Sequence, residues 1–258
     1  TPVLSDKNQV ISGVRISQQY NLKEFDSLDT ALEEFPEMVF VTNPTNLHVD
    51  VAIKALNSGA FVFIEKPVSY DWEGVEELRQ AEHAIGCKKI VIGYQFRFHP
   101  AMKLVKLILE QNRIGHIVGA RFVYGEYIPD WHPYENYRTS YAARKNLGGG
   151  ALVTQIHDFD NAMWFFGRPN QVSSVGGKLS SLELDVEDSV QVLMKLEEEG
   201  QALPVSISLD YLQWPPSRCF SIIGNNGRIE CDLIRSSVFL SDLQCRKTEF
   251  HEFPDFDR

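Results

Sequence analysis

Two apolar patterns alternate in the first hundred residues. Continuous apolar runs at 38–42, 61–64 and 90–93 have the length of buried strands, and apolar residues recur at helical spacing over 47–56 and 72–83. Another helix is expected over residues 7–20, and Ser27 is expected to cap a short helix from Leu28. Strict alternation of such strands with helices predicts an α/β fold, a doubly wound parallel sheet with helices on each side.

From residue 99 onward the pattern becomes that of a large, mostly antiparallel open sheet. A helix is predicted over 100–111, and strand-like runs follow at 117–124, 171–179, 189–195, 202–211, 217–223, 227–233 and 238–240. The run 202–211 alternates apolar and polar residues, which predicts one buried face, and the Asn-Asn-Gly sequence at 225–227 predicts a hairpin turn. We therefore predict two domains, residues 1–98 and an α+β domain over 99–258.

Composition narrows the class of protein. The 258 residues are 43% apolar and 23% charged, which is typical of soluble globular proteins with room for two domains. A net charge of −10 argues against nucleic acid or an anionic membrane as partner. No run is long enough to cross a bilayer and no signal peptide is evident, so we expect a cytoplasmic protein. The four cysteines lack metal-ligand spacing, and no metal site is expected.

The stretch from Gly148 to Gly167 is the main candidate for chemistry. Three glycines precede a helical pattern that predicts a buried apolar face and another face carrying Thr154, His157, Asp158 and Asn161. The glycines would leave free amide groups at a helix N-terminus, which suits an anionic or carbonyl-bearing ligand. His157 is the candidate acid–base residue. From this stretch alone, a purely structural role for His157 stays open.

Polar residues also follow each predicted parallel strand. The loops read Thr-Asn-Pro-Thr-Asn at 42–46, Glu-Lys-Pro at 65–67 and Tyr-Gln-Phe-Arg at 94–97. Ligands of such sheets lie at the carboxyl ends of the strands, so these loops should share one crevice. Lys66 would be a well-oriented cation between Glu65 and Pro67, and the alternative is a solvated lysine in a turn.

Two further segments bear on function. The irregular polar and aromatic stretch 127–138 is long enough to be functional, and its aromatic residues favour a loop that faces a substrate. A dinucleotide-binding domain normally begins with a strand, a glycine-rich turn and a helix, and residues 1–37 contain no such pattern. We therefore expect either a fragment of a longer protein or a sheet that is completed by something other than this chain.

Several motifs, taken in order, resemble the Gfo/Idh/MocA oxidoreductases. The resemblance covers essentially the whole chain and rests on Pro-Thr-Asn-Leu-His at 44–48, Glu-Lys-Pro at 65–67, Arg-Phe-His-Pro at 97–100, the glycine-led helix with His157 and Asp160, and Trp-Phe-Phe-Gly at 164–167. The stretches 131–138 and 143–145 are most similar to members that act in the biosynthesis of modified amino sugars and sialic-acid-like sugars.

The resemblance implies a partial Rossmann domain over 1–98 and a substrate-binding and oligomerisation domain over 99–258. It implies hydride transfer between NAD or NADP and a hydroxyl or keto carbon of a sugar, possible substrates being modified amino sugars and nucleotide sugars. Lys66 and His157 correspond to the catalytic residues, with His157 as proton acceptor. The implied cofactor-binding residues are Thr42, Asn43, Pro44, Asn46, His48, Glu65, Lys66, Gln95 and Arg97, and the implied substrate-binding residues are Trp131, Tyr137, Arg138, Thr154 and His157.

One position departs from the family pattern. Thr154 stands where the family often has an aspartate, so no carboxylate-assisted proton relay is expected there. The alternative functions are a non-catalytic sugar-binding or scaffold protein and a truncated form of an active enzyme; the persistence of Lys66 and His157 favours the latter. The family often pairs through its open sheet, and the apolar residues Tyr211, Leu212, Trp214, Phe220 and Ile222 are expected to form an exposed patch that makes a homodimer or homotetramer.

Overall fold

The computed structural model describes residues 3–4, 10–11, 13, 15–132, 134–198 and 200–254. The chain divides into two compact units. Unit 1 is made of Thr1–Gly93 with His132–Ser140, and unit 2 of Tyr94–Trp131 with Tyr141–Arg258. This division does not test the predicted domain boundary after residue 98, which stays a prediction.

Unit 1 is built on a three-stranded parallel sheet of order β3-β4-β5. The strands are β3 (Met38–Val41), β4 (Phe61–Ile64) and β5 (Ile90–Ile92), as the apolar runs predict. Helices α3 (His48–Asn57) and α4 (Val75–Ile85) supply the apolar residues that pack with Val41, Val62 and Ile64 in one core. Side chains of the opposite parity, among them Phe40 and Val91, are more than 60% exposed. In the described part of unit 1, only one face of the sheet is therefore well covered.

The first forty residues differ from their predicted pattern. The helix predicted over 7–20 is wrong where it is described, because Val10–Ile11 forms strand β2, which pairs with β1 (Val3–Leu4), and helix α1 spans only Ile16–Gln19. Gly13, at φ 80°, adopts a left-handed conformation that cannot continue a helix. Residues 7–9, 12 and 14 of that prediction lie outside the described residues. The Ser27 cap of α2 (Leu28–Leu32) is confirmed, since its Oγ accepts from Thr30 N at 3.2 Å.

Unit 2 contains an eight-stranded sheet of order β13-β12-β11-β10-β6-β9-β8-β7. Only the β6 and β9 pair is parallel among its described neighbours, so the prediction of a mostly antiparallel sheet is confirmed. The sequence pattern does not predict the last strand, because this segment has few apolar residues and no alternation of apolar and polar positions. The strands are β6 (Ile117–Gly125), β7 (Gln171–Gly177), β8 (Ser189–Glu198), β9 (Gln201–Asp210), β10 (Ser217–Gly224), β11 (Gly227–Asp232), β12 (Ser237–Asp242) and β13 (Lys247–Glu252).

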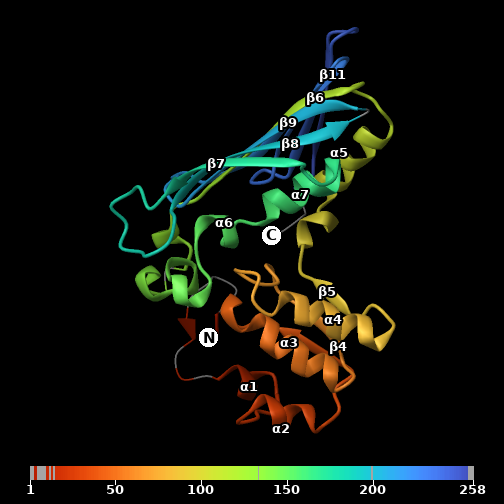
Figure 1. Cartoon of the computed structure of the whole chain (residues 1–258). Coiled ribbons are helices and arrows are strands. Elements are labelled where there is room, and N and C mark those ends of the chain that lie inside the picture. The colour runs from red at the N-terminus through yellow and green to blue at the C-terminus, as the bar shows by residue number, and fades with distance from the viewer. Residues whose placement is uncertain are drawn as a thin grey trace. The chain divides into compact units, whose positions relative to one another are not determined.

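One face of this sheet is covered by helices α5 (Pro100–Glu110), α6 (Ala151–Thr154) and α7 (His157–Phe166), as Figure 1 shows. Tyr211, Phe220 and Ile222 belong to this covered face and are at most 3% exposed, so the prediction that they form an exposed patch is wrong. Strand alternation in β10 directs Phe220 and Ile222 to the covered face, where Phe220 packs against Phe165 of α7 at 5.8 Å between ring centroids. Of the predicted patch, Trp214 and Leu212 are exposed.

Short 3-10 helices complete the connections. No helix in the described ranges is long and apolar enough to cross a membrane. The 3-10 helices are η1 (Thr45–Leu47), η2 (Gln95–Phe98), η3 (Ile128–Asp130), η4 (Tyr137–Thr139), η5 (Tyr141–Ala143) and η6 (Lys145–Leu147).

Candidate functional site

His157 is the first residue of helix α7 and is 4% exposed. The single helix predicted after the glycines is wrong, because the chain forms two helices, α6 and α7, with a break at Gln155 and Ile156. Gln155 stabilises the break by donating from its amide to the Asp210 carbonyl at 3.0 Å. The break lets α7 start a new direction with His157 in its first turn.

The prediction that the apolar face of this segment is its buried face is wrong, because the polar face is the more deeply buried. Thr154, His157, Asp158 and Asn161 are at most 6% exposed, whereas the apolar Met163 is 40% exposed. Periodicity separates the two faces of a helix but does not say which one packs inward. A buried polar face needs internal partners. Asp158 has one in unit 2, whereas the side-chain oxygen and nitrogen of Asn161 have no hydrogen-bond partner among the described residues.

The main partner is Arg218 on β10, which forms a buried ion pair with Asp158 at 3.1 Å. The Arg218 guanidinium lies 4.1 Å from the ring centroids of both Phe96 and Tyr124. Burial raises the pKa of Asp158 and Arg218 opposes that rise, while burial is also the main cause of a raised pKa of Tyr124. Arg218 thus ties the first turn of α7 to the sheet, and the sequence analysis missed it.

Aromatic rings surround His157 on the side of η2. Phe96 meets its imidazole edge-on at 4.9 Å between centroids, and Tyr94 does so at 6.1 Å. Burial raises the pKa of Tyr94, so its phenol stays protonated at neutral pH. These rings give His157 a largely apolar environment within unit 2.

Arg97, a predicted cofactor-binding residue, forms a bidentate pair with Asp160 on α7. The Nε–Oδ2 and Nη2–Oδ1 distances are 2.8 and 2.5 Å, and the pairing raises the pKa of Arg97. The neighbouring Gln95 is exposed. The Asp160 carboxylate therefore holds η2 against α7, and contact of Arg97 or Gln95 with a cofactor stays a prediction.

The amide groups after the glycines are already occupied. Leu152 N donates to Glu187 Oε1 at 3.0 Å, and Ala151 N donates to the Glu187 carbonyl at 3.1 Å. Gly150 has φ 119°, and a Cβ atom there would lie 2.3 Å from Glu187 Oε1. The expectation of free amides for an anionic ligand is wrong at these two positions, because the backbone carbonyl of Glu187 takes one amide and its carboxylate takes the other.

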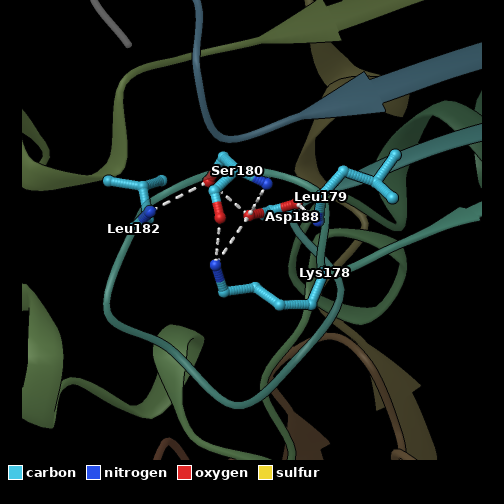
Figure 2. Close-up of polar contacts among 5 residues, drawn as sticks. All are labelled: Lys178, Leu179, Ser180, Leu182 and Asp188. Atoms are coloured by element: carbon cyan, nitrogen blue, oxygen red, sulfur yellow. Dashed lines mark hydrogen bonds and ion pairs between the residues drawn. The ribbon is translucent and has the colours of Figure 1, made fainter.

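The segment that carries Glu187, residues 178–188, is ordered by its neighbour Asp188 (Figure 2). The buried Asp188 carboxylate accepts from the amides of Leu179 and Ser180 at 2.7 and 3.1 Å and from the Ser180 hydroxyl. Lys178 Nζ lies 3.9 Å from Asp188 Oδ2 and donates to the Ser180 carbonyl. Burial raises the pKa of Asp188, but the hydrogen bonds outweigh it, so the pKa is lowered.

Thr154 and Trp131, two predicted substrate-binding residues, both lie beside Tyr211. The Thr154 side chain lies close to the Tyr211 phenol, whose hydroxyl donates to the Ala142 carbonyl at 3.2 Å. Burial raises the pKa of Tyr211 well above its usual value. The Trp131 indole meets the Tyr211 ring edge-on at 5.2 Å, and its buried Nε1–H finds no acceptor among the described residues.

The rest of the predicted loop 127–138 includes Tyr137 and Arg138, which belong to unit 1. The Arg138 guanidinium stacks on the Tyr137 ring at 4.8 Å. Pro133 lies outside the described residues. Participation of Tyr137 and Arg138 in substrate binding stays a prediction.

Lys66 follows strand β4 in unit 1, in a half-buried loop. The Glu65 carboxylate turns back to accept from Lys66 N at 3.2 Å, and the peptide bond between Lys66 and Pro67 is cis. The buried His48 lies beneath this loop, with both ring nitrogens near backbone carbonyls. Lys66 and His157 thus belong to different units, and their convergence stays a prediction.

The loop after β3 carries the other predicted cofactor-binding residues of unit 1. Thr42 and Pro44 are exposed, while Asn43 and Asn46 are half-buried. The Oδ1 atoms of Asn43 and Asn46 are buried and have no hydrogen-bond donor among the described residues. Buried acceptors normally find a partner, so these two atoms are suited to a ligand with hydroxyl or amide donors.

Comparison with known proteins adds two family matches, in chain order. Residues 5–94 match the model described as an oxidoreductase family with an NAD-binding Rossmann fold, and residues 102–230 match the GFO/IDH/MocA C-terminal domain. The two matches cover the three-stranded sheet of unit 1 and most of the sheet of unit 2.

Curated relatives include sugar and cyclitol dehydrogenases. Levoglucosan dehydrogenase of Pseudarthrobacter phenanthrenivorans is 30% identical over 142 residues, 54% of this chain and 35% of that protein. Inositol 2-dehydrogenase of Salmonella typhimurium is 26% identical over 78% of this chain and 56% of that protein. The chain therefore spans about a third to just over half of the length of these relatives.

Solved structures share the fold. The WlbA dehydrogenase of Bordetella pertussis, in complex with NADH and UDP-GlcNAcA, has a TM-score of 0.74 at 21% identity and covers 93% of this chain and 70% of its own. A levoglucosan dehydrogenase in complex with NADH and levoglucosan has a TM-score of 0.76 at 22% identity, with 92% and 67% coverage.

Proposed function

Because the chain belongs to the Gfo/Idh/MocA family of oxidoreductases, we propose that it takes part in hydride transfer between NAD or NADP and a hydroxyl or keto carbon of a sugar. The observation that carries this proposal is the match of both family domains in order, together with a buried histidine at the start of α7. Lys66 and His157 are the proposed catalytic residues, and the proposal requires that they face the same substrate carbon.

The residues of unit 1 fit a nicotinamide dinucleotide. Asn43 and Asn46 offer buried amide oxygens without a donor in the described ranges, and ribose hydroxyl or carboxamide groups could supply donors. Lys66 adds a cation in the half-buried loop after β4. When bound, the nicotinamide supplies the group that accepts or donates the hydride.

The chain's own residues handle the proton and the developing charge. His157, enclosed by Phe96 and Tyr94, accepts the hydroxyl proton when an alcohol is oxidised and returns it in the reverse reaction. The Lys66 ammonium stabilises the negative charge that develops on the substrate oxygen. The Asp158–Arg218 pair keeps the first turn of α7 in place.

The substrate is proposed to be a sugar, a modified amino sugar or a nucleotide sugar. Trp131 presents an indole N–H without an acceptor in the described part of the chain, and aromatic rings pack well on sugar faces. Arg138 would bind a carboxylate or phosphate of the substrate. The names of the relatives, which include levoglucosan and inositol dehydrogenases, support this class.

A sugar-binding protein without catalysis is the second candidate. The observation in its favour is Thr154, which stands where the family often has an aspartate and lies close to Tyr211. If the protein only binds sugar, the His157→Asn variant would bind sugar as tightly as the wild type, and neither would reduce NAD or NADP.

The test combines cofactor binding with turnover. NADH and NADPH are titrated by fluorescence, and oxidation of levoglucosan, inositol and UDP-linked amino sugars is followed by absorbance of the reduced cofactor. We expect turnover that falls by about 100- to 10,000-fold in His157→Asn, the usual contribution of a general base, with cofactor affinity unchanged. The control is His83→Asn on the exposed side of α4. Sugar binding without turnover in any combination would favour the second candidate.

We also propose that the uncovered face of the unit 2 sheet pairs with a second copy of this chain. This open face bears Val175, Leu193, Ile223, Phe239 and Phe250, which are 40–78% exposed. A shallow groove of about 510 Å³ on the same face is lined by charges of both signs, Arg121, Arg228, Glu230 and Asp232. A twofold axis can place such opposite charges against each other.

A further inference from the structure

His48 occupies a position between two loops of unit 1. It is the first residue of α3 and is 1% exposed. Its Nδ1 lies 2.7 Å from the carbonyl oxygen of Pro67, and its Nε2 lies 2.8 Å from that of Asn43. One ring therefore bridges the loop after β3 and the loop after β4.

The two partners determine what the ring does. A backbone carbonyl oxygen only accepts hydrogen bonds, so a ring nitrogen that bonds one of these two oxygens does so as the donor. The charged residues on the three segments that meet here are Asp50 and Lys54 on α3 and Glu65 and Lys66 after β4, while residues 42–47 carry none. Glu65 and Lys66 are engaged with each other through the carboxylate and the backbone amide.

The bridge fixes the segments that hold the proposed catalytic and cofactor-binding groups. Pro67 directly follows Lys66, and Asn43 carries one of the buried amide oxygens that lack a donor in the described ranges. The start of the β4 loop is already tied to β3 by the bond from Glu65 N to the Val41 carbonyl at 2.9 Å. His48 adds the corresponding tie beyond Lys66, so that Lys66 lies between two fixed points.

We propose that His48 is a positioning residue whose ring clasps the two loops, setting the place of Lys66 relative to the loop 42–47. His48 acts through the backbone of the two loops. While its ring nitrogens contact the carbonyl oxygens of Pro67 and Asn43, they are not available to a cofactor. The proposal rests on the proposed function for the role of Lys66, but the clasp itself is a property of unit 1.

The ring hydrogen bonds test the clasp without any ligand. Long-range ¹H–¹⁵N spectra of the intact chain should show a hydrogen-bonded N–H on the His48 ring that is protected from exchange with solvent, assigned by its loss in His48→Gln. A His48 ring N–H that exchanges as freely as that of the exposed His83 would overturn the clasp.

Amide hydrogen exchange tests the positioning role. The glutamine side chain in His48→Gln cannot reach both carbonyl oxygens as the ring does, so exchange over 65–69 should quicken by about fivefold, the effect of losing one hydrogen bond. His48→Leu should exceed this, and His83→Gln on α4 should match the wild type. Unchanged exchange in a folded His48→Gln protein would overturn the proposal.

Neither measurement needs catalytic turnover, so both remain decisive if the proposed hydride transfer fails. If turnover is found, the clasp predicts that His48→Gln lowers activity in the wild-type background. In a protein that already carries Lys66→Ala, the same substitution should lower activity further by less than twofold. A full additional loss in the Lys66→Ala background would show that His48 acts independently of Lys66.

Discussion

At the scale of single residues, the buried pair of Asp158 and Arg218 distinguishes this structure most clearly from an ordinary amphipathic helix. Both side chains are at most 8% exposed, and the guanidinium is enclosed by two aromatic rings. Such a pair adds little stability over apolar residues of the same size, but loss of one partner leaves a buried charge uncompensated. Its effect should therefore be seen most clearly when only one partner is removed.

We predict that Asp158→Ala lowers the free energy of unfolding by about 3 to 5 kcal/mol, the usual penalty for an unpaired buried charge. Replacing both residues, with Asp158→Leu and Arg218→Met, should recover most of that loss. Urea denaturation followed by circular dichroism measures both variants. Glu34→Ala is the control, because the 2.6 Å pair of Glu34 with Lys23 is more than half exposed and should contribute far less. Equal losses for Asp158→Ala and Glu34→Ala would contradict the prediction.

At the scale of elements, the segment 178–188 organises the approach to α6. Asp188 orders the segment itself, Glu187 caps the first amides of α6, and Asp185 Oδ1 accepts from Lys145 N at 2.7 Å. A connection between two strands thereby determines where the glycine-rich segment enters its helix. Two predictions belong to this scale.

Asp188→Asn should destabilise the protein by about 1 to 3 kcal/mol near neutral pH, because hydrogen bonds to a charged acceptor are lost or weakened. The pKa of Asp188 is lowered from 3.8 in the folded state, so its stabilisation is complete above that value and is lost as the pH falls through the lower, folded-state pKa. Urea denaturation of both proteins over a pH series should show their difference shrinking only below about pH 4. A difference that grows on acidification would contradict the assigned sign.

Gly150→Ala should destabilise the protein more than Gly167→Ala. Both positions have a positive φ, but a new Cβ at Gly150 would meet the Glu187 carboxylate at 2.3 Å, whereas nothing lies within 4 Å at Gly167. The backbone conformation alone costs about 1 to 3 kcal/mol in either variant, and the collision adds to it only at Gly150. Thermal unfolding of the two variants compares them directly, and a larger loss at Gly167 would show that Glu187 can move aside.

At the scale of the whole molecule, the uncovered face of the unit 2 sheet is the feature with the widest consequence. If this face pairs with a second copy, Leu193→Glu on β8 would bury a charge against apolar surface and should shift the chain toward the monomer by at least tenfold in dissociation constant. Analytical ultracentrifugation at micromolar concentration measures the shift. Trp72→Ser, which changes an 88% exposed residue of unit 1, is the control. A monomeric wild-type protein would remove the basis for this pairing.

The sequence by itself determined the parts of the fold that depend on local periodicity. The three parallel strands, helices α3, α4 and α5, and seven of the eight strands of the unit 2 sheet are close to their predicted ranges. Apolar spacing and turn residues act over a few positions, so they can be recognised without knowing the neighbours of an element. The motifs at 65–67 and 148–167 likewise identified Lys66 and His157 as the residues to examine.

Only the tertiary structure decided which face of α7 is buried, what caps α6 and what His48 binds. In each case the partner is far away in the chain, since Arg218 is 60 residues from Asp158, Glu187 is 35 from Leu152 and Pro67 is 19 from His48. A polar helix face is normally directed to solvent, and it packs inward here because a buried arginine from β10 compensates the Asp158 charge. Such pairings leave no periodic signal in the chain, because they depend on strand order and register, which only the folded sheet brings together.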